Sequence, residues 1–414
     1  MNIFYLSYKS LISRPLSSLL SWLLLSFGVT VVVLILLVSD QLKSEINKNA
    51  QGIDMVVGAK GSPMQLILSS IFHADFPTGN ISLKQAAQLS KNRYIAQTIP
   101  LSLGDSYKGY RIVGTTQAYG QLYEAEILSG NWFEGSMQAV VGAEVAEELK
   151  MGLGAEFESQ HGLTDDGDTH EHSPFSVVGV LKATNTVLDK LILVDVPSVW
   201  MVHGHDEAEE HHHEEHGEGL ITLDKLGISV TGEQFEHEEI TSMLIKYRSP
   251  MAAVMLPRTV NDMSDLQAAS PAYETARLFN IIGVGIDVMN ILGLLIIIIS
   301  AVSVFIALLN SLKDRKYDIA IMRSMGATGS QIFIHVLTEG IIVTILGCAS
   351  GLFIAHGLIG ILASNLNDLN LDWRIFVKEE GWVVIGCLVI GVISSIIPAF
   401  LAYRTDISKT LSKT

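Results

Sequence analysis

The sequence predicts a membrane protein, α-helical with four transmembrane helices, plus an α+β extracytoplasmic domain inserted between helices 1 and 2. Apolar residues make up 49% of the 414 residues. Four apolar runs are each long enough to cross a bilayer, for which ~20 residues suffice. A polar stretch with alternating, strand-like segments lies between the first two runs. The four predicted spans are residues 18–39, 279–310, 331–363 and 382–403.

Residues 1–17 precede the first span and predict a short interfacial helix, because Lys9 and Arg14 stand among apolar side chains. The competing interpretation of residues 18–39 is a cleaved signal peptide. However, this run is longer than a typical signal core, and no small-x-small cleavage pattern follows Val38. We therefore expect an uncleaved anchor whose N-terminus lies in the cytoplasm.

Positive charge in the loops orients the spans. Lysine and arginine gather in the short segment 311–330 and return in the tail 404–414, which marks both as cytoplasmic. The segment 364–381 carries more acid than base and is expected to face outward. Four spans with both termini inside agree with the charge of every loop. The predicted location is the cell inner membrane, multi-pass, with a large periplasmic domain.

The polar stretch 40–277 predicts the extracytoplasmic α+β domain. Its strand-like run at 52–63 ends in Gly/Pro turn residues and would link the first span to the domain. Both cysteines, Cys348 and Cys387, lie in apolar runs, so the domain contains no disulfide. Further strands are expected at residues 109–115, 139–142, 175–181, 190–194 and 241–247, and helices at 142–149, 196–202 and 261–269.

Composition excludes two classes of function. A formal net charge of −16 argues against nucleic acid as a partner, because nucleic-acid binding needs clustered lysine and arginine. The sequence also contains no Gly-x-x-x-x-Gly-Lys-Ser/Thr motif, so the chain lacks a phosphate-binding loop and cannot hydrolyse ATP alone. The chain is therefore expected not to be an enzyme, and its partners are membrane lipids and other proteins.

The cytoplasmic segment 311–330 has a pattern of its own. Ile319, Met322 and Met325 recur at helical spacing, while four charged residues project elsewhere, so a short helix with an apolar and a charged surface is expected. Gly326 would end this helix. An ordinary solvated positive-inside loop is the alternative interpretation. The four charged residues are Arg315, Lys316, Asp318 and Arg323.

The same segment resembles the cytoplasmic segment of FtsX-like permeases, the family that includes MacB and the lipoprotein-releasing permeases LolC and LolE. Those proteins have a basic residue, an acidic residue, Ile-Ala, two hydrophobic residues, Arg and a small-residue pair. This chain departs mildly, with Asp318 in place of Glu and Met322 in place of Leu. The positions that carry the resemblance are Arg315, Asp318, Ile319, Ala320, Ile321, Met322, Arg323, Gly326 and Ala327.

In that family the segment is the coupling helix that docks on a separate ATPase. The resemblance therefore implies an ABC ATPase subunit dimer as partner and a second permease copy or paralogue beside this chain. It also implies a MacB-type periplasmic domain, with an inserted β-rich subdomain at about 105–225. The residues expected to couple to the ATPase are Arg315, Asp318, Ile319, Met322, Arg323, Gly326 and Ala327.

The function implied is that of a permease subunit of a MacB/FtsX-type ABC transporter. It would convert ATP hydrolysis by the separate subunit into movement of the periplasmic domain, for export, lipoprotein release or metal-linked transport. The alternative is a non-transporting signal transmitter that activates a periplasmic partner such as a cell-wall hydrolase. A metal-binding receptor without any ATPase is disfavoured by the coupling segment.

A histidine-rich segment, residues 203–219, interrupts the outer domain. Its imidazoles alternate with carboxylates, a combination that suits Zn²⁺ and also Cu²⁺ or Ni²⁺. We expect a hydrated loop that binds Zn²⁺ weakly at several exchangeable sites, with no cofactor required and with a periplasmic metal-binding protein or lipoprotein as a further partner. An acidic loop that collects metal adventitiously is the alternative. The candidate ligands are His203, His205, His211, His212, His213 and His216.

Polar residues within the spans are few. His335 and Glu339 lie near one end of the third span, and an acid inside a membrane is a candidate functional residue. Interhelical hydrogen bonds or snorkelling are the alternative roles. The small residues of 347–351 (Gly-Cys-Ala-Ser-Gly) are expected to pack one helix closely against another.

Overall fold

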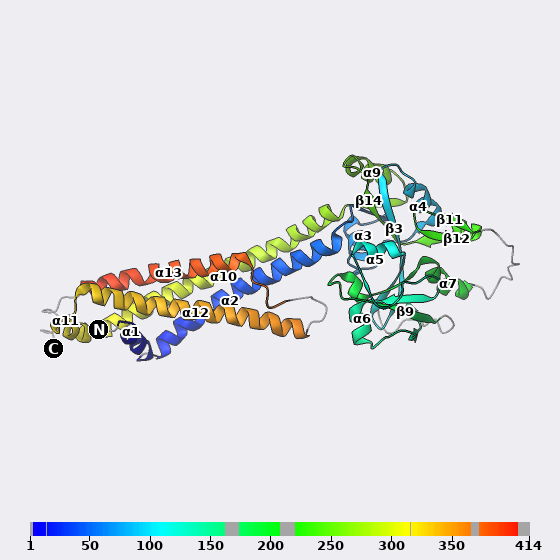
Figure 1. The fold of residues 1–414 in the computed structure, drawn as a ribbon. Coiled ribbons are helices and arrows are strands. Elements are labelled where there is room, and N and C mark those ends of the chain that lie inside the picture. Colours follow the sequence, from blue (N-terminus) through cyan, green and yellow to red (C-terminus); the bar gives the residue numbers. More distant parts are fainter. Residues whose placement is uncertain are drawn as a thin grey trace. The chain divides into compact units, whose positions relative to one another are not determined.

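The computed structural model divides into two compact units. Met1–Ser44 and Asn280–Thr414 form the helical unit, and Glu45–Phe279 form the α/β unit. Figure 1 shows the ribbon of both units. The residues that the structure describes are 3–13, 15–161, 174–207, 220–314, 316–365 and 372–404.

Four long helices dominate the helical unit, and all four are long and apolar enough to cross a membrane. The α/β unit lies between the first and the second of them in the chain, so the predicted fold class is confirmed. With 44 residues, α10 is about 66 Å long at about 1.5 Å per residue. It therefore continues well beyond a bilayer core of ~30 Å. The four helices are α2 (Pro15–Ala50), α10 (Pro271–Asp314), α12 (Gly329–Asn365) and α13 (Lys378–Tyr403).

Small residues allow these helices to approach closely, as the sequence predicts for residues 347–351. A Cβ atom added at Gly351 would lie 2.7 Å from the backbone oxygen of Ser26, and one added at Gly347 would lie 2.9 Å from the side chain of Leu25. In addition, the Thr30 hydroxyl donates to the Gly351 carbonyl at 3.1 Å. Helices α2 and α12 are thus held together by close backbone contact and by a hydrogen bond.

Among its described residues, the helical unit also contains two short helices, α1 (Ile3–Ile12) and α11 (Lys316–Ser324). α1 packs on α12, and α11 connects α10 to α12. One apolar cluster joins α11 to three of the long helices through Ile319, Val304, Ile332 and Ala399. A second cluster joins α2, α12 and α13 near Val33, so the bundle has two separate apolar cores.

Within the described residues, eleven strands of the α/β unit form one connected sheet, whose main path is β15-β1-β14-β3-β4-β10-β6-β9-β5. β7 pairs with β9, and β8 pairs with β3. The strands are β1 (Met55–Ala59), β3 (Ile95–Tyr107), β4 (Tyr110–Thr115), β5 (Ile127–Gly130), β6 (Gln138–Val141), β7 (Glu156–Phe157), β8 (Gln160–His161), β9 (Phe175–Leu181), β10 (Leu191–Asp195), β14 (Ser242–Tyr247) and β15 (Leu266–Ala269).

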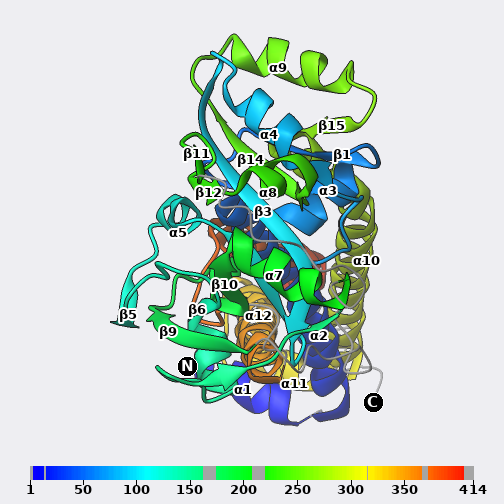
Figure 2. The same cartoon turned by 90° about the vertical axis from the view of Figure 1, so that its right-hand side faces the viewer.

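The 13-residue strand β3 connects the two halves of this sheet. It pairs with β14 on one side and with β4 on the other, and its pairing with β4 is irregular between Leu103 and Ser106. Figure 2 shows β3 running through the unit. Two pairs of short strands lie outside the sheet. These are β2 (Ile81–Ser82) with β13 (Glu239–Ile240), and β11 (Ile221–Leu223) with β12 (Ile228–Val230).

Helices cover the sheet and separate three apolar cores. One of these cores draws only on residues from Tyr107 to Val202, which lie inside the predicted insertion. The other two surround β1 and β14. The helices are α3 (Pro63–Ser70), α4 (Leu83–Ser90), α5 (Gln117–Leu122), α6 (Ala143–Glu148), α7 (Val196–Glu207), α8 (Gly232–His237) and α9 (Ala252–Asn261), with a 3₁₀ turn at Val187–Lys190.

The expected strands at 109–115, 139–142, 175–181, 190–194 and 241–247 are confirmed as β4, β6, β9, β10 and β14. The expected helix at 261–269 is wrong. Helix α9 ends at Asn261, and β15 pairs with β1, so that Val56 lies opposite Ala269. Pairing with a buried strand outweighed the local preference, because it buries Leu266, Ala268 and Ala269.

The expected loop at 203–219 also differs at its start. Helix α7 continues through His203 and His205 to Glu207, so these two histidines are helical in backbone conformation. The other four candidate ligands, His211, His212, His213 and His216, lie outside the described residues.

Candidate functional site

The candidate coupling segment is helix α11 with its two ends. Gly326 ends the helix with a φ of 101°, a conformation that favours glycine. The Ala327 N–H donates to the Met322 carbonyl at 3.0 Å, and the Gly326 N–H donates to the Arg323 carbonyl at 3.1 Å. This pair of bonds is a Schellman motif, so Gly326 ends the helix as predicted.

The start of α12 follows at once and is also capped. The Thr328 hydroxyl accepts from the Gln331 N–H at 3.3 Å, and the Gln331 side chain accepts from the Thr328 N–H at 2.9 Å. This reciprocal pair is a capping box. The connection between α11 and α12 is therefore a defined turn, which fixes the direction of the short helix.

Helix α11 has one buried and one exposed face. Ile319 and Ala320 are buried against the helical unit, and Met322 packs partly against the same cluster. Tyr317, Ile321 and Met325 are spaced four residues apart, with exposed fractions of 50%, 36% and 82%. Side chains at this spacing lie on one side of a helix. We call these three residues the α11 stripe.

The predicted coupling residues divide between these faces. Ile319 and Met322 hold α11 to its own chain, so in this arrangement they position the helix and present little surface to a partner. Arg323 is half-buried. Arg315 lies outside the described residues, and Asp318 is placed only by its helical backbone. Periodicity could identify the helix, but not which of its apolar faces would pack inward.

A cavity of about 380 Å³ lies beside the buried face of α11. Helices α1, α10, α11 and α12 line it, with five apolar side chains and the polar side chains of Lys9, Ser13, Ser311, His335 and Glu339. The Ser7 hydroxyl donates to the His335 carbonyl at 3.1 Å and therefore accepts from the ring Nδ1 of His335 at 2.8 Å. His335 thus ties α1 to α12, one of the two roles left open by the sequence.

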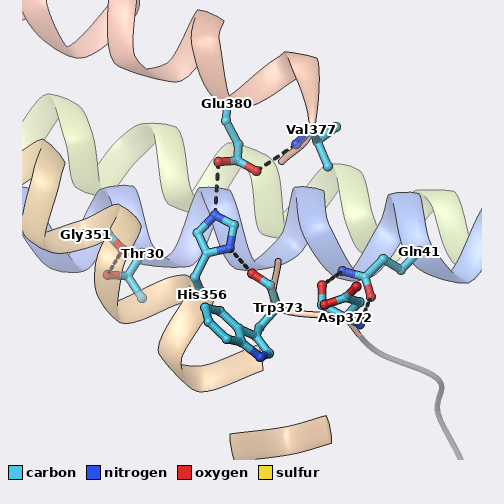
Figure 3. Close-up of polar contacts among 8 residues, drawn as sticks. All are labelled: Thr30, Gln41, Gly351, His356, Asp372, Trp373, Val377 and Glu380. Atoms are coloured by element: carbon cyan, nitrogen blue, oxygen red, sulfur yellow. Dashed lines mark hydrogen bonds and ion pairs between the residues drawn. The ribbon is translucent and has the colours of Figure 1, made fainter. Parts of the chain in front are cut away.

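The other end of the bundle is closed by hydrogen bonds (Figure 3). The Gln41 side-chain amide of α2 donates to the Asp372 carbonyl at 3.1 Å, and its oxygen accepts from the Asp372 N–H at 2.8 Å. These bonds attach the segment that precedes α13 to α2. His356 of α12 lies 2.7 Å from the Trp373 carbonyl through Nδ1, and 3.2 Å from the Glu380 carboxylate through Nε2.

Within the α/β unit, the last turn of α2 is attached to the turn before β10. Lys48 Nζ donates to the carbonyls of Thr184 and Asn185 at 2.9 and 2.8 Å. The Asn49 side-chain oxygen accepts from the Val187 N–H at 3.0 Å, and the Asn49 carbonyl accepts from the Tyr123 hydroxyl at 2.8 Å. These four bonds fix the last turn of α2 to the part of the chain that lies in the predicted insertion.

The turn before β10 is itself held rigidly by hydrogen bonds. The buried carboxylate of Asp189 accepts from the Thr184 N–H at 2.8 Å, from the Thr184 hydroxyl at 2.9 Å and from the Asn185 N–H at 2.7 Å. Sequence reasoning missed this attachment, although the Thr-Asn-Thr run at 184–186 before Asp189 is a turn signal.

Among the side chains that the structure describes, no group of three or more histidine, cysteine, aspartate or glutamate residues is close enough to hold a metal ion. The side chains of the six candidate zinc ligands lie outside that search. The zinc prediction therefore remains a prediction.

The site is that of a polytopic membrane protein with a folded domain between its first two spans. A family model of the FtsX-like permease C-terminal region matches residues 290–407, and one of the MacB-like periplasmic core domain matches residues 18–231. The second match alone covers just over half of the 414 residues, so the chain belongs to the MacB/FtsX-like permease family. Permeases of this family generally work with an ABC ATPase partner and are not enzymes themselves.

Solved structures of outer domains are similar to this chain. The periplasmic region of MacB from Actinobacillus actinomycetemcomitans has 14% identity and a TM-score of 0.33, over 57% of this chain and 98% of that chain. The extracellular domain of the noncanonic ABC-type transporter YknZ from Gram-positive bacteria has 12% identity and a TM-score of 0.31, over 52% and 99%. None of the curated proteins compared with the chain matches it. Four apolar helices and a MacB-like periplasmic domain fit an inner-membrane protein.

Proposed function

We propose that this chain is the permease subunit of an ABC transporter of the MacB/FtsX type. A separate ATPase dimer docks on helix α11, and ATP hydrolysis by that dimer moves the periplasmic domain. Both termini and α11 lie in the cytoplasm, and a second permease copy or a paralogue completes the membrane assembly.

The observation that carries this proposal is the α11 stripe. Its three side chains are apolar and exposed, yet α11 is held firmly by Ile319 and by the Schellman motif at its C-terminal end. An exposed apolar stripe on a fixed helix is suited to a protein partner, because the helix loses little conformational freedom on binding. Movement of α11 would pass directly to α10 and α12, between which it is the only described helix.

The last turn of α2 supports an outward mechanical step. Its four hydrogen bonds to the turn at 184–187 and to Tyr123 attach the helix to the sheet-bearing part of the α/β unit. A shift of α2 along its axis would therefore move this turn as a rigid body. Transport of a cargo through the bundle is less well supported, because the described spans contain few buried charges.

The movement could serve either of two functions. The first is transport, which includes export, lipoprotein release and metal-linked transport. The second is signalling to a periplasmic enzyme. Stimulation of the ATPase by a small solute or a lipoprotein would favour transport. Activation of a cell-wall hydrolase that binds the periplasmic domain, without such stimulation, would favour the signal transmitter.

The histidine-rich segment supports a link to metal. We place weak, exchangeable Zn²⁺ binding at His203, His205, His211, His212, His213 and His216, with a periplasmic metal-binding protein as a further partner. Calorimetric titration of the purified full chain with Zn²⁺ should show more than one weak site. A chain with these six residues changed to Asn should give a flat trace, and equal heats from both chains would remove zinc from the proposal.

Docking on α11 is tested with two matched variants. Changing Ile321→Asp and Met325→Asp together should weaken binding of the cognate ATPase about 10-fold or more, because central apolar contacts dominate such interfaces. Met255→Asp, at an exposed residue of α9, should leave binding unchanged. Affinity for the ATPase is measured with the purified full chain in nanodiscs. In the same nanodiscs, Arg323→Glu should uncouple the activity of the bound ATPase from the permease. Unchanged affinity and coupling in these variants would contradict docking on α11.

A further inference from the structure

The outer closure of the bundle contains a histidine whose two ring nitrogens both face oxygen acceptors. His356 Nδ1 lies 2.7 Å from the Trp373 carbonyl, which can only accept, so Nδ1 carries a hydrogen. Nε2 lies 3.2 Å from a carboxylate oxygen of Glu380, while the other carboxylate oxygen accepts from the Val377 N–H at 3.0 Å. Figure 3 shows His356 between Trp373 and Glu380.

These contacts require one proton between the ring and the acid. If His356 were neutral with its hydrogen on Nδ1, its Nε2 lone pair would face an ionised carboxylate, and the contact would be repulsive. A proton on either Nε2 or Glu380 makes the contact a hydrogen bond. Both residues are buried, His356 at 8% and Glu380 at 5% exposure, so water cannot replace that bond.

We propose that His356 and Glu380 form a proton-binding site, and that the bound proton keeps the outer end of the bundle closed. The pair connects three elements: α12 through His356, α13 through Glu380, and the segment before α13 through the Trp373 carbonyl. The same segment is attached to α2 by Gln41, and the Phe376 ring lies against the His356 ring, tilted by 38° with 4.5 Å between centroids. Loss of the proton removes the central bond of this closure.

The charged side chains of residues 40–43 and 372–379 are exposed, so water screens them. Asp40 and Lys43 lie on α2, Asp372 and Arg374 on the segment before α13, and Lys378 and Glu379 on the first turn of α13. Arg374 stacks on the Trp373 ring, and its N–H donates to the Asp372 carboxylate at 2.9 Å. The ionisable side chain that pairs with the His356 ring is that of Glu380.

The number of protons held by the closed pair and by the separated groups sets the direction of the pH effect. In water an imidazole loses its charge near pH 6.5 and a glutamic acid near pH 4.3, each about the value for free groups. Above pH 6.5 the separated groups hold one proton fewer than the closed pair, so closure weakens as the pH rises. One proton changes the equilibrium at most tenfold per pH unit, or about 100-fold between pH 6.5 and 8.5. With the proposed topology, the pH sensed is that outside the inner membrane.

The test measures closure directly in the full chain, without an ATPase. The chain carries Cys348→Ala and Cys387→Ala and is reconstituted in nanodiscs. Spin labels are attached at Asp40→Cys of α2 and at Ile375→Cys of the segment before α13. Pulsed electron resonance then gives the label distances at pH 5.5 and 8.5. The unaltered site should give a narrow distribution at pH 5.5, and a broad or longer one at pH 8.5.

Glu380→Gln is the decisive variant. The neutral amide can donate to Nε2 and still accept from Val377, so closure should persist at both pH values. His356→Gln removes one partner of the pair and should also abolish the pH response, which keeps the test usable if one variant fails to fold. The control Glu379→Gln, at the exposed neighbouring acid, should respond as the parent does. A parent without a pH response, or either site variant with the parental response, overturns the proposal.

Discussion

The two ends of the helical bundle differ in how their helices are joined. At the end that carries α11, apolar side chains remain exposed and a cavity of about 380 Å³ separates α1 from α11. At the end that carries Asp372 and Trp373, backbone and side-chain polar groups bond to one another across α2, α12 and α13. Trp373 and Phe376 are exposed at this second end as well, so the two ends differ in the polar bonds that join the helices and in the cavity.

The largest expected effect tests the buried side of α11. Ile319→Asp should destabilise the helical unit by about 3–5 kcal/mol, because it places an unpaired carboxylate among the apolar side chains of three long helices. Met325→Asp should change stability by about 0.5 kcal/mol or less, since that side chain is 82% exposed. Unfolding of the full chain in mixed micelles, followed by circular dichroism, gives both values. Equal losses would mean that α11 does not have one packed and one free face.

A buried histidine of the α/β unit is expected to respond to pH in the opposite direction from the His356–Glu380 pair. In the α/β unit, His73 is buried with Nε2 2.8 Å from the Tyr119 hydroxyl, and burial, assisted by Arg111, lowers the pKa of His73 to about 3. The folded chain stays neutral there while the unfolded chain takes a proton below about pH 6.5. The free energy of unfolding of this unit should therefore fall by about 2 kcal/mol between pH 7 and pH 5.

Acid is thus expected to weaken the α/β unit, whereas base is expected to weaken the end of the bundle that carries His356 and Glu380. Hydrogen exchange of β14 amides in the full chain measures the first effect, after correction for intrinsic rates. His73→Gln retains a group that can bond to Tyr119 and should remove this part of the pH dependence. An unchanged slope in the variant would show that His73 is not the group responsible.

A smaller effect is expected at Gln41. Gln41→Leu removes both hydrogen bonds to Asp372 and should cost about 1–2 kcal/mol, because each neutral bond contributes about 1 kcal/mol. The loss should appear as faster hydrogen exchange in the described residues 372–377, with α11 unaffected. Faster exchange at both ends would indicate that the two ends are not independent.

The smallest effect concerns the turn that ends α11. Gly326→Ala should cost about 1 kcal/mol, since alanine is strained at a φ of 101°. Gly357→Ala is a matched control, because Gly357 lies in α12 with open space around an added Cβ atom. Alanine there should be neutral or slightly stabilising. Thermal unfolding of the two variants distinguishes the turn from glycine replacement in general.

Sequence patterns predicted where the helices lie along the chain better than which side of each helix is buried. Runs of apolar residues identified all four long helices, because length and hydropathy are local properties. The resemblance to FtsX-like permeases implied that Ile319 and Met322 couple to the ATPase, whereas packing against α10, α12 and α13 buries Ile319 and part of Met322. Only the assembled bundle decides which side of a short helix remains exposed.

Contacts between distant residues were likewise beyond sequence reasoning. Glu380 and Asp372 appeared only as charges of an outer loop, whereas their bonds to His356 and Gln41 depend on how α2, α12 and α13 meet. Asn49 and Tyr123 gave no signal, because their hydrogen bond joins residues 74 positions apart. Gly326 was predictable, because ending a helix needs only the backbone freedom of glycine.

The most direct test of the account is hydrogen exchange of the full chain in nanodiscs, with and without its cognate ABC ATPase. The ATPase should slow exchange of the described residues 316–327, which include the α11 stripe, and should leave residues 372–377 unchanged. If the ATPase binds tightly while residues 316–327 exchange as fast as in the chain alone, α11 is not where the ATPase docks, and the central claim is contradicted.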